Sequence, residues 1–180
     1  MAAGGRRGWN TWDMSSDRHT PGDSSHRRPP AAPAVRPADG PPVELDADAY
    51  AAMVAHAISG YPLEACGLLG GVVGSQRIEA FCPAHNADES AKTYSIGPGG
   101  FADAEAMFAP RGLEIVGVMH SHTHTDAYPS PTDIDKADNP LLVGWKYVIV
   151  SLRDEVPVLR SYLLDGREVV EEVVELFRVP

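Results

Sequence analysis

Apolar residues recur along this chain with two periods, one of about 3.6 residues and one of about two, which are the periods of helices and strands. Runs with the helical period predict helices over residues 48–59, 100–112 and 130–139. Asp46 or Asp48 is the expected N-cap of the first helix, and Gly60 with Pro62 ends it. The apolar stripe of this helix is formed by Tyr50, Met53, Val54, Ala57 and Ile58.

Short apolar runs rich in β-branched and aromatic residues predict strands. These runs cover residues 42–45, 66–73, 77–84, 93–97, 113–122, 146–152 and 156–177. Residues 113–122 are apolar almost throughout and are expected to form a central strand. The last run is expected to be a hairpin that turns at Asp165-Gly166, and its end, VVEEVVELF, fits either a strand or a short helix. The order of elements predicts an α+β fold with one mixed β-sheet flanked by helices.

Residues 1–41 differ in composition from the remainder of the chain. They are rich in Pro, Arg, Ser and Gly, and such a segment buries too little apolar surface to offset the entropy cost of ordering it. We therefore expect a disordered N-terminal extension over residues 1–41 and a single folded domain over residues 42–180.

The overall composition argues against several classes of partner. The chain of 180 residues carries a formal net charge of −10, and a surface of that sign repels nucleic-acid phosphates. No apolar stretch approaches the roughly 20 residues that span a bilayer. Two cysteines, Cys66 and Cys82, give no disulfide framework. We expect a cytoplasmic protein that binds neither nucleic acid nor membrane.

Three of the seven histidines lie within five residues, in the stretch HSHTH at the end of the predicted central strand. Side chains two residues apart share one face of a strand, so His120 and His122 project together. Asp133, in the first turn of the next predicted helix, can add an oxygen ligand. Two imidazoles and a carboxylate suit Zn²⁺ or a similar divalent ion. On local geometry alone, His122 and His124 form an equally good pair.

The stretch resembles the JAMM metalloprotease signature of the MPN+ or Mov34 family, in which His-x-His is followed by seven residues, Ser, two residues and Asp. Here His120-Ser121-His122 precedes Ser130 and Asp133 at those intervals. The family's upstream glutamate matches Glu64 in EACG, and the likeness extends over residues 43 to about 175. The resemblance implies a JAB/MPN fold, which is cytidine-deaminase-like.

It also implies a role for each matched residue. His120, His122 and Asp133 would bind one Zn²⁺ per chain, and Glu64 would be the general base. Ser130 would stabilise the oxyanion of the tetrahedral intermediate, although it can also cap the helix that carries Asp133. In related enzymes, residues at the places of Asn86 and Ser90 line the substrate groove.

Further stretches, YVIVSLRD and LRSYLLDG, resemble the actinobacterial branch that releases cysteine from a sulfur-carrier protein. The implied function is hydrolysis of the amide bond between the C-terminal Gly-Gly of a ubiquitin-like sulfur-carrier protein and cysteine, as a step of cysteine biosynthesis. One alternative is a JAMM peptidase or isopeptidase that acts on another ubiquitin-like modifier or carrier. Another is a non-catalytic MPN scaffold, against which the intact set of metal ligands argues.

Overall fold

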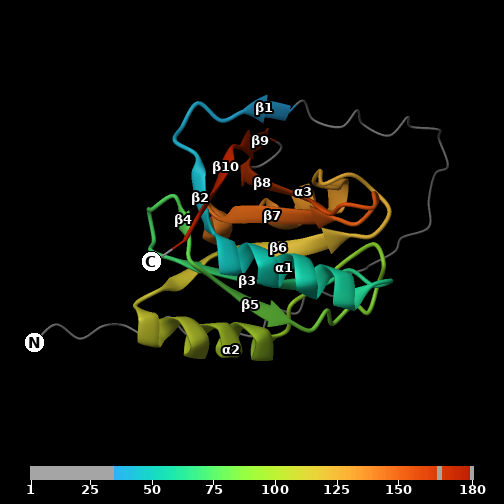
Figure 1. Cartoon of the computed structure of the whole chain (residues 1–180), viewed down its shortest axis with the longest axis horizontal. Helices are drawn as coiled ribbons and strands as arrows, with labels where there is room; N and C mark the ends of the chain where they lie inside the picture. The colour runs from blue at the N-terminus through green and yellow to red at the C-terminus, as the bar shows by residue number, and fades with distance from the viewer. Residues whose placement is uncertain (1–34, 166–167, 179–180) are drawn as a thin grey trace, which may run out of the picture. The chain divides into compact units, whose positions relative to one another are not determined.

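The computed structural model describes residues 35–165 and 168–178. Its strands form a seven-stranded sheet in the order β1-β9-β8-β7-β6-β3-β5 and a three-stranded sheet in the order β10-β2-β4 (Figure 1). The larger sheet contains β1 (Val35–Pro37), β3 (Cys66–Gly71), β5 (Ala80–Ala84), β6 (Glu114–His122), β7 (Lys146–Ser151), β8 (Val158–Asp165) and β9 (Glu168–Glu172). The smaller contains β2 (Val43–Asp46), β4 (Arg77–Ile78) and β10 (Val174–Phe177). The helices are α1 (Ala47–Gly60), α2 (Pro98–Phe108) and α3 (Pro131–Ala137), with 3-10 turns at Ala109–Arg111 and Pro140–Leu142.

The start and end of α1 follow the capping signals of the sequence. The Asp46 carboxylate accepts hydrogen bonds from the backbone amides of Asp48 and Ala49, both at 3.0 Å, so Asp46 is the N-cap. The predicted apolar stripe was wrong at one position, because Ile58 is 56% exposed. The buried residues of the helix are instead Ala49, Met53 and Ala57, whose four-residue spacing keeps them on one face.

The helices cover both faces of the larger sheet. In Figure 1, α1 runs across one face, where Met53 packs in one cluster with Met119 of β6 and Val148 of β7. The small sheet adds Val43, Leu45 and Ile78 to the same cluster. Helices α2 and α3 pack against the opposite face, to which Val118 of β6 points. His120 and His122 lie on this second face, the one that carries α3.

Strands β6 and β7 are a parallel pair at the centre of the sheet, connected through α3. Gly117 allows them to approach closely, because a Cβ at this position would lie 2.2 Å from the carbonyl oxygen of Lys146. The chain leaves β6 at His122 and enters α3 at Pro131. The carboxyl end of a parallel strand is a common place for a binding site, and the histidine cluster lies there.

Three predicted strands differ from the structure. Residues 77–84 form two strands in different sheets, because Arg77–Ile78 pairs with β2 whereas Ala80–Ala84 pairs with β3. Residues 93–97 form no strand; only Ile96 makes an isolated bridge, with Asn86. Residues 156–177 form β8, β9 and β10, so the end of this run is a strand and not a helix. Asp165 pairs with Glu168 in the hairpin, while Gly166 lies outside the described residues.

The folded part begins before Pro42, which was the predicted boundary. Strand β1 pairs in parallel with β9, with Val35 opposite Val169, and Arg36 forms ion pairs with Glu168 and Asp39. Backbone pairing with the sheet edge therefore orders a segment whose composition gives no sign of it. Residues 1–34 of the predicted extension lie outside the described residues.

Within the described part of the chain, no helix has the length and apolar character to cross a bilayer.

Candidate metal centre

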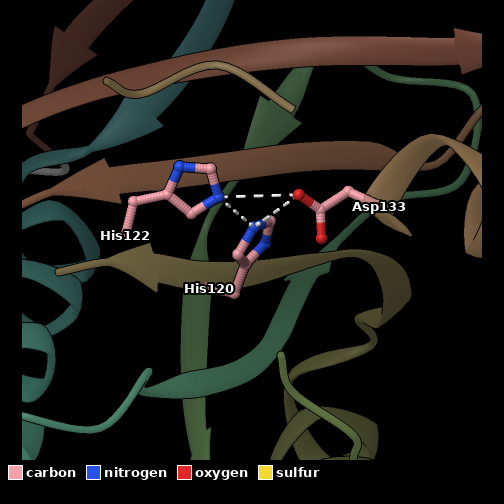
Figure 2. Close-up of side chains that lie close together, drawn as sticks. All are labelled: His120, His122 and Asp133. Carbon is pink, nitrogen blue, oxygen red and sulfur yellow. Dashed lines mark hydrogen bonds and ion pairs between the residues drawn. The ribbon is translucent and has the colours of Figure 1, made fainter. Parts of the chain in front are cut away.

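His120, His122 and Asp133 come together at the carboxyl end of β6 (Figure 2). The two Nε2 atoms of the histidines are 3.1 Å apart. Asp133 Oδ2 lies 3.4 Å from Nε2 of His120 and 3.5 Å from Nε2 of His122. All three residues are buried, with exposed fractions of 0%, 4% and 7%. Three ligand atoms therefore converge on a single point, away from bulk solvent.

The spacing of these atoms fits a small divalent ion. A tetrahedral zinc ion with ligands at about 2.0–2.1 Å sets those ligands about 3.3–3.4 Å apart. The three separations, 3.1, 3.4 and 3.5 Å, bracket that value. Two imidazole nitrogens and one carboxylate oxygen are also the ligand types of a catalytic zinc site with an open fourth position. The donor set and its geometry thus fit a zinc-type ion.

Hydrogen bonds orient the imidazole of His122. Its Nδ1 lies 2.7 Å from the backbone oxygen of Asp126 and 3.0 Å from the hydroxyl of Thr125. A proton on Nδ1, donated to the Asp126 carbonyl, leaves the Nε2 lone pair free for a metal. Burial lowers the pKa of His122, but hydrogen bonds to Asp133 and to the Asp126 carbonyl outweigh it, so the pKa is raised overall.

The start of α3 fixes Asp133. The Ser130 hydroxyl accepts a hydrogen bond from the Asp133 amide at 3.2 Å, and the Ser130 amide donates to Asp133 Oδ2 at 2.7 Å, which together form a capping box. Burial by itself would raise the pKa of Asp133. The charge of His120 and the hydrogen bonds with His120, His122 and Ser130 outweigh burial, so the pKa lies well below its ordinary value. The carboxylate is therefore charged at neutral pH, as a metal ligand must be.

Glu64 precedes β3 and is 6% exposed. Its backbone amide donates to the Ser90 carbonyl at 2.8 Å, and its carbonyl accepts from Asn86 Nδ2 at 2.9 Å. Burial raises the pKa of Glu64 to about 7; the charge of His122 opposes this rise and that of Asp133 adds to it. The charges of both His122 and Asp133 therefore act on this carboxyl.

Ser121, which separates the two histidines, connects β6 to the segment of Glu64. Its hydroxyl accepts a hydrogen bond from the Ala65 amide at 2.8 Å, and its own amide donates to the Ala65 carbonyl, also at 2.8 Å. Because Ser121 points to the face opposite the histidines, its role is structural. It connects the segment of Glu64 to the strand that carries His120 and His122.

Asn86 and Ser90, predicted to line the substrate groove, hold the loop next to Glu64. The Asn86 side chain donates to the carbonyls of Glu64 and Thr93, at 2.9 and 3.0 Å, and its Oδ1 accepts from two backbone amides. Ser90 offers its carbonyl to Glu64 and its hydroxyl to the Lys92 amide. As contacts of a substrate, both residues stay predictions.

Two other residues considered from the sequence lie outside the cluster. His124 is exposed and packs edge-on against Tyr61, with ring centroids 6.0 Å apart. The strand ends at His122, so the His122–His124 pair that local geometry allowed is not formed. Cys66 is buried, and burial raises the pKa of its thiol to about 12, so it is not a nucleophile at neutral pH.

Sequence reasoning missed two residues at this site. The ring of Tyr94 stacks on the imidazole of His120, with centroids 4.4 Å apart and planes inclined by 18°. Lys136 donates to the Tyr94 carbonyl at 2.6 Å. Tyr94 lies in the segment predicted as a strand, and its distance along the sequence from the histidine motif does not indicate a contact with His120. This contact depends on the tertiary structure.

Comparison with known proteins places this arrangement in a family. Residues 46–165 match the model of prokaryotic homologs of the JAB domain. The chain belongs to this JAB family. Over 138 residues the JAB chain is 41% identical to CysO-cysteine peptidase of Mycobacterium tuberculosis and Mycobacterium bovis, a match covering 73% of this chain and 89% of the relative.

A second relative of the JAB chain, desampylase of Haloferax volcanii, is 32% identical over 114 residues, which are 61% of this chain and 80% of that protein. Among solved structures, a protein from Desulfitobacterium hafniense determined in solution is 33% identical with a TM-score of 0.67, covering 76% of this chain and 93% of the other. These findings confirm the predicted family and α+β fold, and they make the JAB chain a hydrolase of the peptidase class.

Proposed function

We propose that this JAB peptidase is zinc-dependent and hydrolyses the amide bond between the C-terminal Gly-Gly of a ubiquitin-like sulfur-carrier protein and cysteine, which releases cysteine for biosynthesis. The observation that carries the proposal is the 41% identity to CysO-cysteine peptidase. The cluster of His120, His122 and Asp133 supports the metal. A cytoplasmic location, expected from the sequence, stays a prediction.

His120, His122 and Asp133 would hold one Zn²⁺ per chain. When bound, such an ion activates water as a nucleophile and polarises the scissile carbonyl. The protein holds three buried side chains whose ligand atoms are already at coordinating separations, so little reorganisation is needed.

Glu64 would act as general base and then as general acid. A group with a pKa near the working pH gives and takes protons most efficiently, and burial raises the pKa of Glu64 to about 7. Glu64 would accept a proton from the attacking water and deliver it to the nitrogen of the leaving cysteine. This delivery lets the amine leave in its neutral form.

Ser130 would donate its hydroxyl proton to the oxyanion that forms on the scissile carbonyl. As the N-cap, its oxygen accepts from the Asp133 amide through a lone pair, so capping does not use the hydroxyl proton. Capping and catalysis are therefore compatible, since one uses a lone pair and the other the proton. A donor of this kind contributes roughly 10²–10³-fold to the rate.

The test is hydrolysis of a purified ubiquitin-like sulfur carrier that ends in Gly-Gly-Cys by zinc-loaded protein, followed by intact-mass spectrometry. We expect loss of one cysteine residue from the carrier. Glu64→Gln should slow the loss by roughly 10²–10⁴-fold, and His120→Ala should abolish it, while each variant remains folded. A carrier that retains its cysteine during long incubation with active-site-intact, zinc-loaded protein would refute the proposed substrate.

A second candidate is a peptidase that acts on another ubiquitin-like modifier, which the 32% identity to desampylase favours. The same assay separates the two. The assay compares kcat/KM for two sets of substrates. One set differs only in the folded domain that precedes Gly-Gly-Cys, and the other differs only in the residue joined to Gly-Gly. Preference for a modifier joined to a lysine side chain over the cysteine-bearing carrier would support the second candidate.

A further inference from the structure

We propose that Tyr94 is the positioning residue for His120: its ring, stacked on the imidazole and held in place by Lys136, fixes the orientation in which the imidazole binds the metal. The inference rests on the proposed function, because it concerns the same metal. It adds a role for two residues that lie outside the motif.

The two histidines are oriented in different ways. His122 directs Nδ1 to the Asp126 carbonyl and the Thr125 hydroxyl. The Nδ1 of His120 is buried and has no hydrogen-bond partner among the described residues. A histidine that binds a metal normally fixes its ring by a hydrogen bond from the second nitrogen. His120 therefore needs a different restraint.

The stack with Tyr94 supplies that restraint. The two rings are nearly parallel, inclined by 18°, and their centroids are 4.4 Å apart. Rotation of the imidazole about its Cβ–Cγ bond would drive its edge into the tyrosine ring. An imidazole that coordinates a cation becomes electron-poor, and the electron-rich face of a phenol ring attracts such a group. The stack thus favours the metal-bound state as well as the correct orientation.

Tyr94 lies in a loop, yet contacts on both sides fix it. Lys136 Nζ donates to the Tyr94 carbonyl at 2.6 Å and lies 5.4 Å from the centroid of its ring. Asn86 binds the two neighbours of Tyr94, because Nδ2 donates to the Thr93 carbonyl at 3.0 Å and Oδ1 accepts from the Ser95 amide at 3.2 Å. The ring is therefore a rigid surface for His120.

Helix α3 connects this restraint to the third ligand. Lys136 follows Asp133 by three residues, so both side chains lie on neighbouring positions of one helix face. Lys136 also pairs with Asp88 at 3.8 Å, and Asp88 accepts from the Ser95 hydroxyl at 2.5 Å. A displacement of α3 would thus move Asp133 and release Tyr94 together, which couples two of the three ligands, Asp133 and His120, to one small helix.

The test measures binding of Zn²⁺ alone by competition with a chromophoric chelator, for the parental protein, Tyr94→Leu and Tyr94→Phe. Leucine keeps bulk but loses the flat ring, and we expect it to weaken zinc binding by roughly 10–100-fold, as loss of an outer-shell contact does. Phenylalanine keeps the stack and should remain within about threefold of the parental value. Tyr61→Leu is the matched control, because Tyr61 contacts His124, which is not a ligand; its zinc affinity should be unchanged.

The visible spectrum of the Co²⁺-substituted protein gives a second readout. We expect its d–d bands to shift in Tyr94→Leu and Lys136→Met, because the His120 ring is no longer fixed, and to match the parental bands in Tyr94→Phe and Lys136→Arg. Circular dichroism is used to check that each variant is folded. If Tyr94→Leu does not fold, the comparison of Lys136→Met with Lys136→Arg tests the inference instead.

Three results would overturn the inference: parental zinc affinity in Tyr94→Leu, equal losses in the leucine and phenylalanine variants, or parental spectra in Lys136→Met. A parental protein that binds no zinc would instead refute the metal itself, so the two failures are distinguishable.

Discussion

The Glu64 carboxyl should destabilise the folded chain at neutral pH although catalysis requires it. Glu64→Gln should therefore raise stability and lower activity. The carboxyl of Glu64 is protonated in both the folded and the unfolded chain below about pH 4.5. As pH rises from 4.5 to about 7, the unfolded chain loses the proton while the folded chain retains it, because burial raises the pKa in the folded state to about 7. Ionisation therefore opposes folding increasingly over this range, and the full penalty is reached above about pH 7.

The size of this penalty follows from the raised pKa. A carboxyl whose pKa rises from 4.5 to about 7 on folding opposes folding by at most about 3 kcal/mol. Solvent that reaches the site screens the charge, so we expect about 1–2 kcal/mol. Glu64→Gln, a neutral side chain of the same shape, should stabilise the metal-free protein by this amount at about pH 8 and by little at about pH 5. The same change should lower kcat by roughly 10²–10⁴-fold through loss of the general base.

The assay is urea denaturation of chelator-treated protein at both pH values, followed by circular dichroism and extrapolated to water. Glu155→Gln, at an exposed glutamate, is the control and should change neither stability nor rate. Equal stability of Glu64→Gln and the parental protein at both pH values would show that the carboxylate is not desolvated. Retained activity in Glu64→Gln would remove it from the catalytic machinery.

Three further predictions concern the capping serine, a buried ion pair and the ligands. Ser130→Ala should lower kcat by roughly 10²–10³-fold and the free energy of unfolding by about 1 kcal/mol, measured by carrier hydrolysis and urea denaturation; full activity would contradict the oxyanion role. Lys146→Met should cost about 3–5 kcal/mol in urea denaturation because Lys146 forms a buried ion pair with Glu172, and Lys146→Met combined with Glu172→Leu should recover most of it. Zinc affinity, measured with a chromophoric chelator, should fall by roughly tenfold or more from about pH 8 to about pH 6, because a bound imidazole must be neutral and the pKa of His122 is raised; affinity independent of pH would argue against histidine ligands.

The sequence alone predicted the elements whose signals are local. For the cap of α1 the sequence offered Asp46 or Asp48, of which the structure has Asp46; Ser130 caps α3, and the apolar run that ends in His120 and His122 is a central strand. Such features depend on residues within a turn or two of each other, so periodicity and capping chemistry suffice to place them. The alternation of side chains along a strand likewise predicts that the two imidazoles share one face.

Local pattern did not determine which strand pairs with which. The sequence of residues 77–84 predicts one strand, yet the chain changes sheets within it, because its first part pairs with β2 and its second part with β3. Composition likewise gave no sign that Val35–Pro37 would pair with β9. Pairing of this kind depends on partners outside the local segment, more than a hundred residues away for β1 and β9, so the segment's own residues do not determine it.

At the site, the sequence by itself determined the ligand types and their order along the chain, because the motif fixes those at set intervals. Only the tertiary structure decided their convergence to within 3.5 Å, the raised pKa of Glu64, and the stack of Tyr94 on His120. These properties arise from burial and from contacts between distant segments. The sequence therefore gives the types of the reacting groups. The fold determines their pKa values and orientations, because desolvation and fixed orientation arise only when the chain is packed.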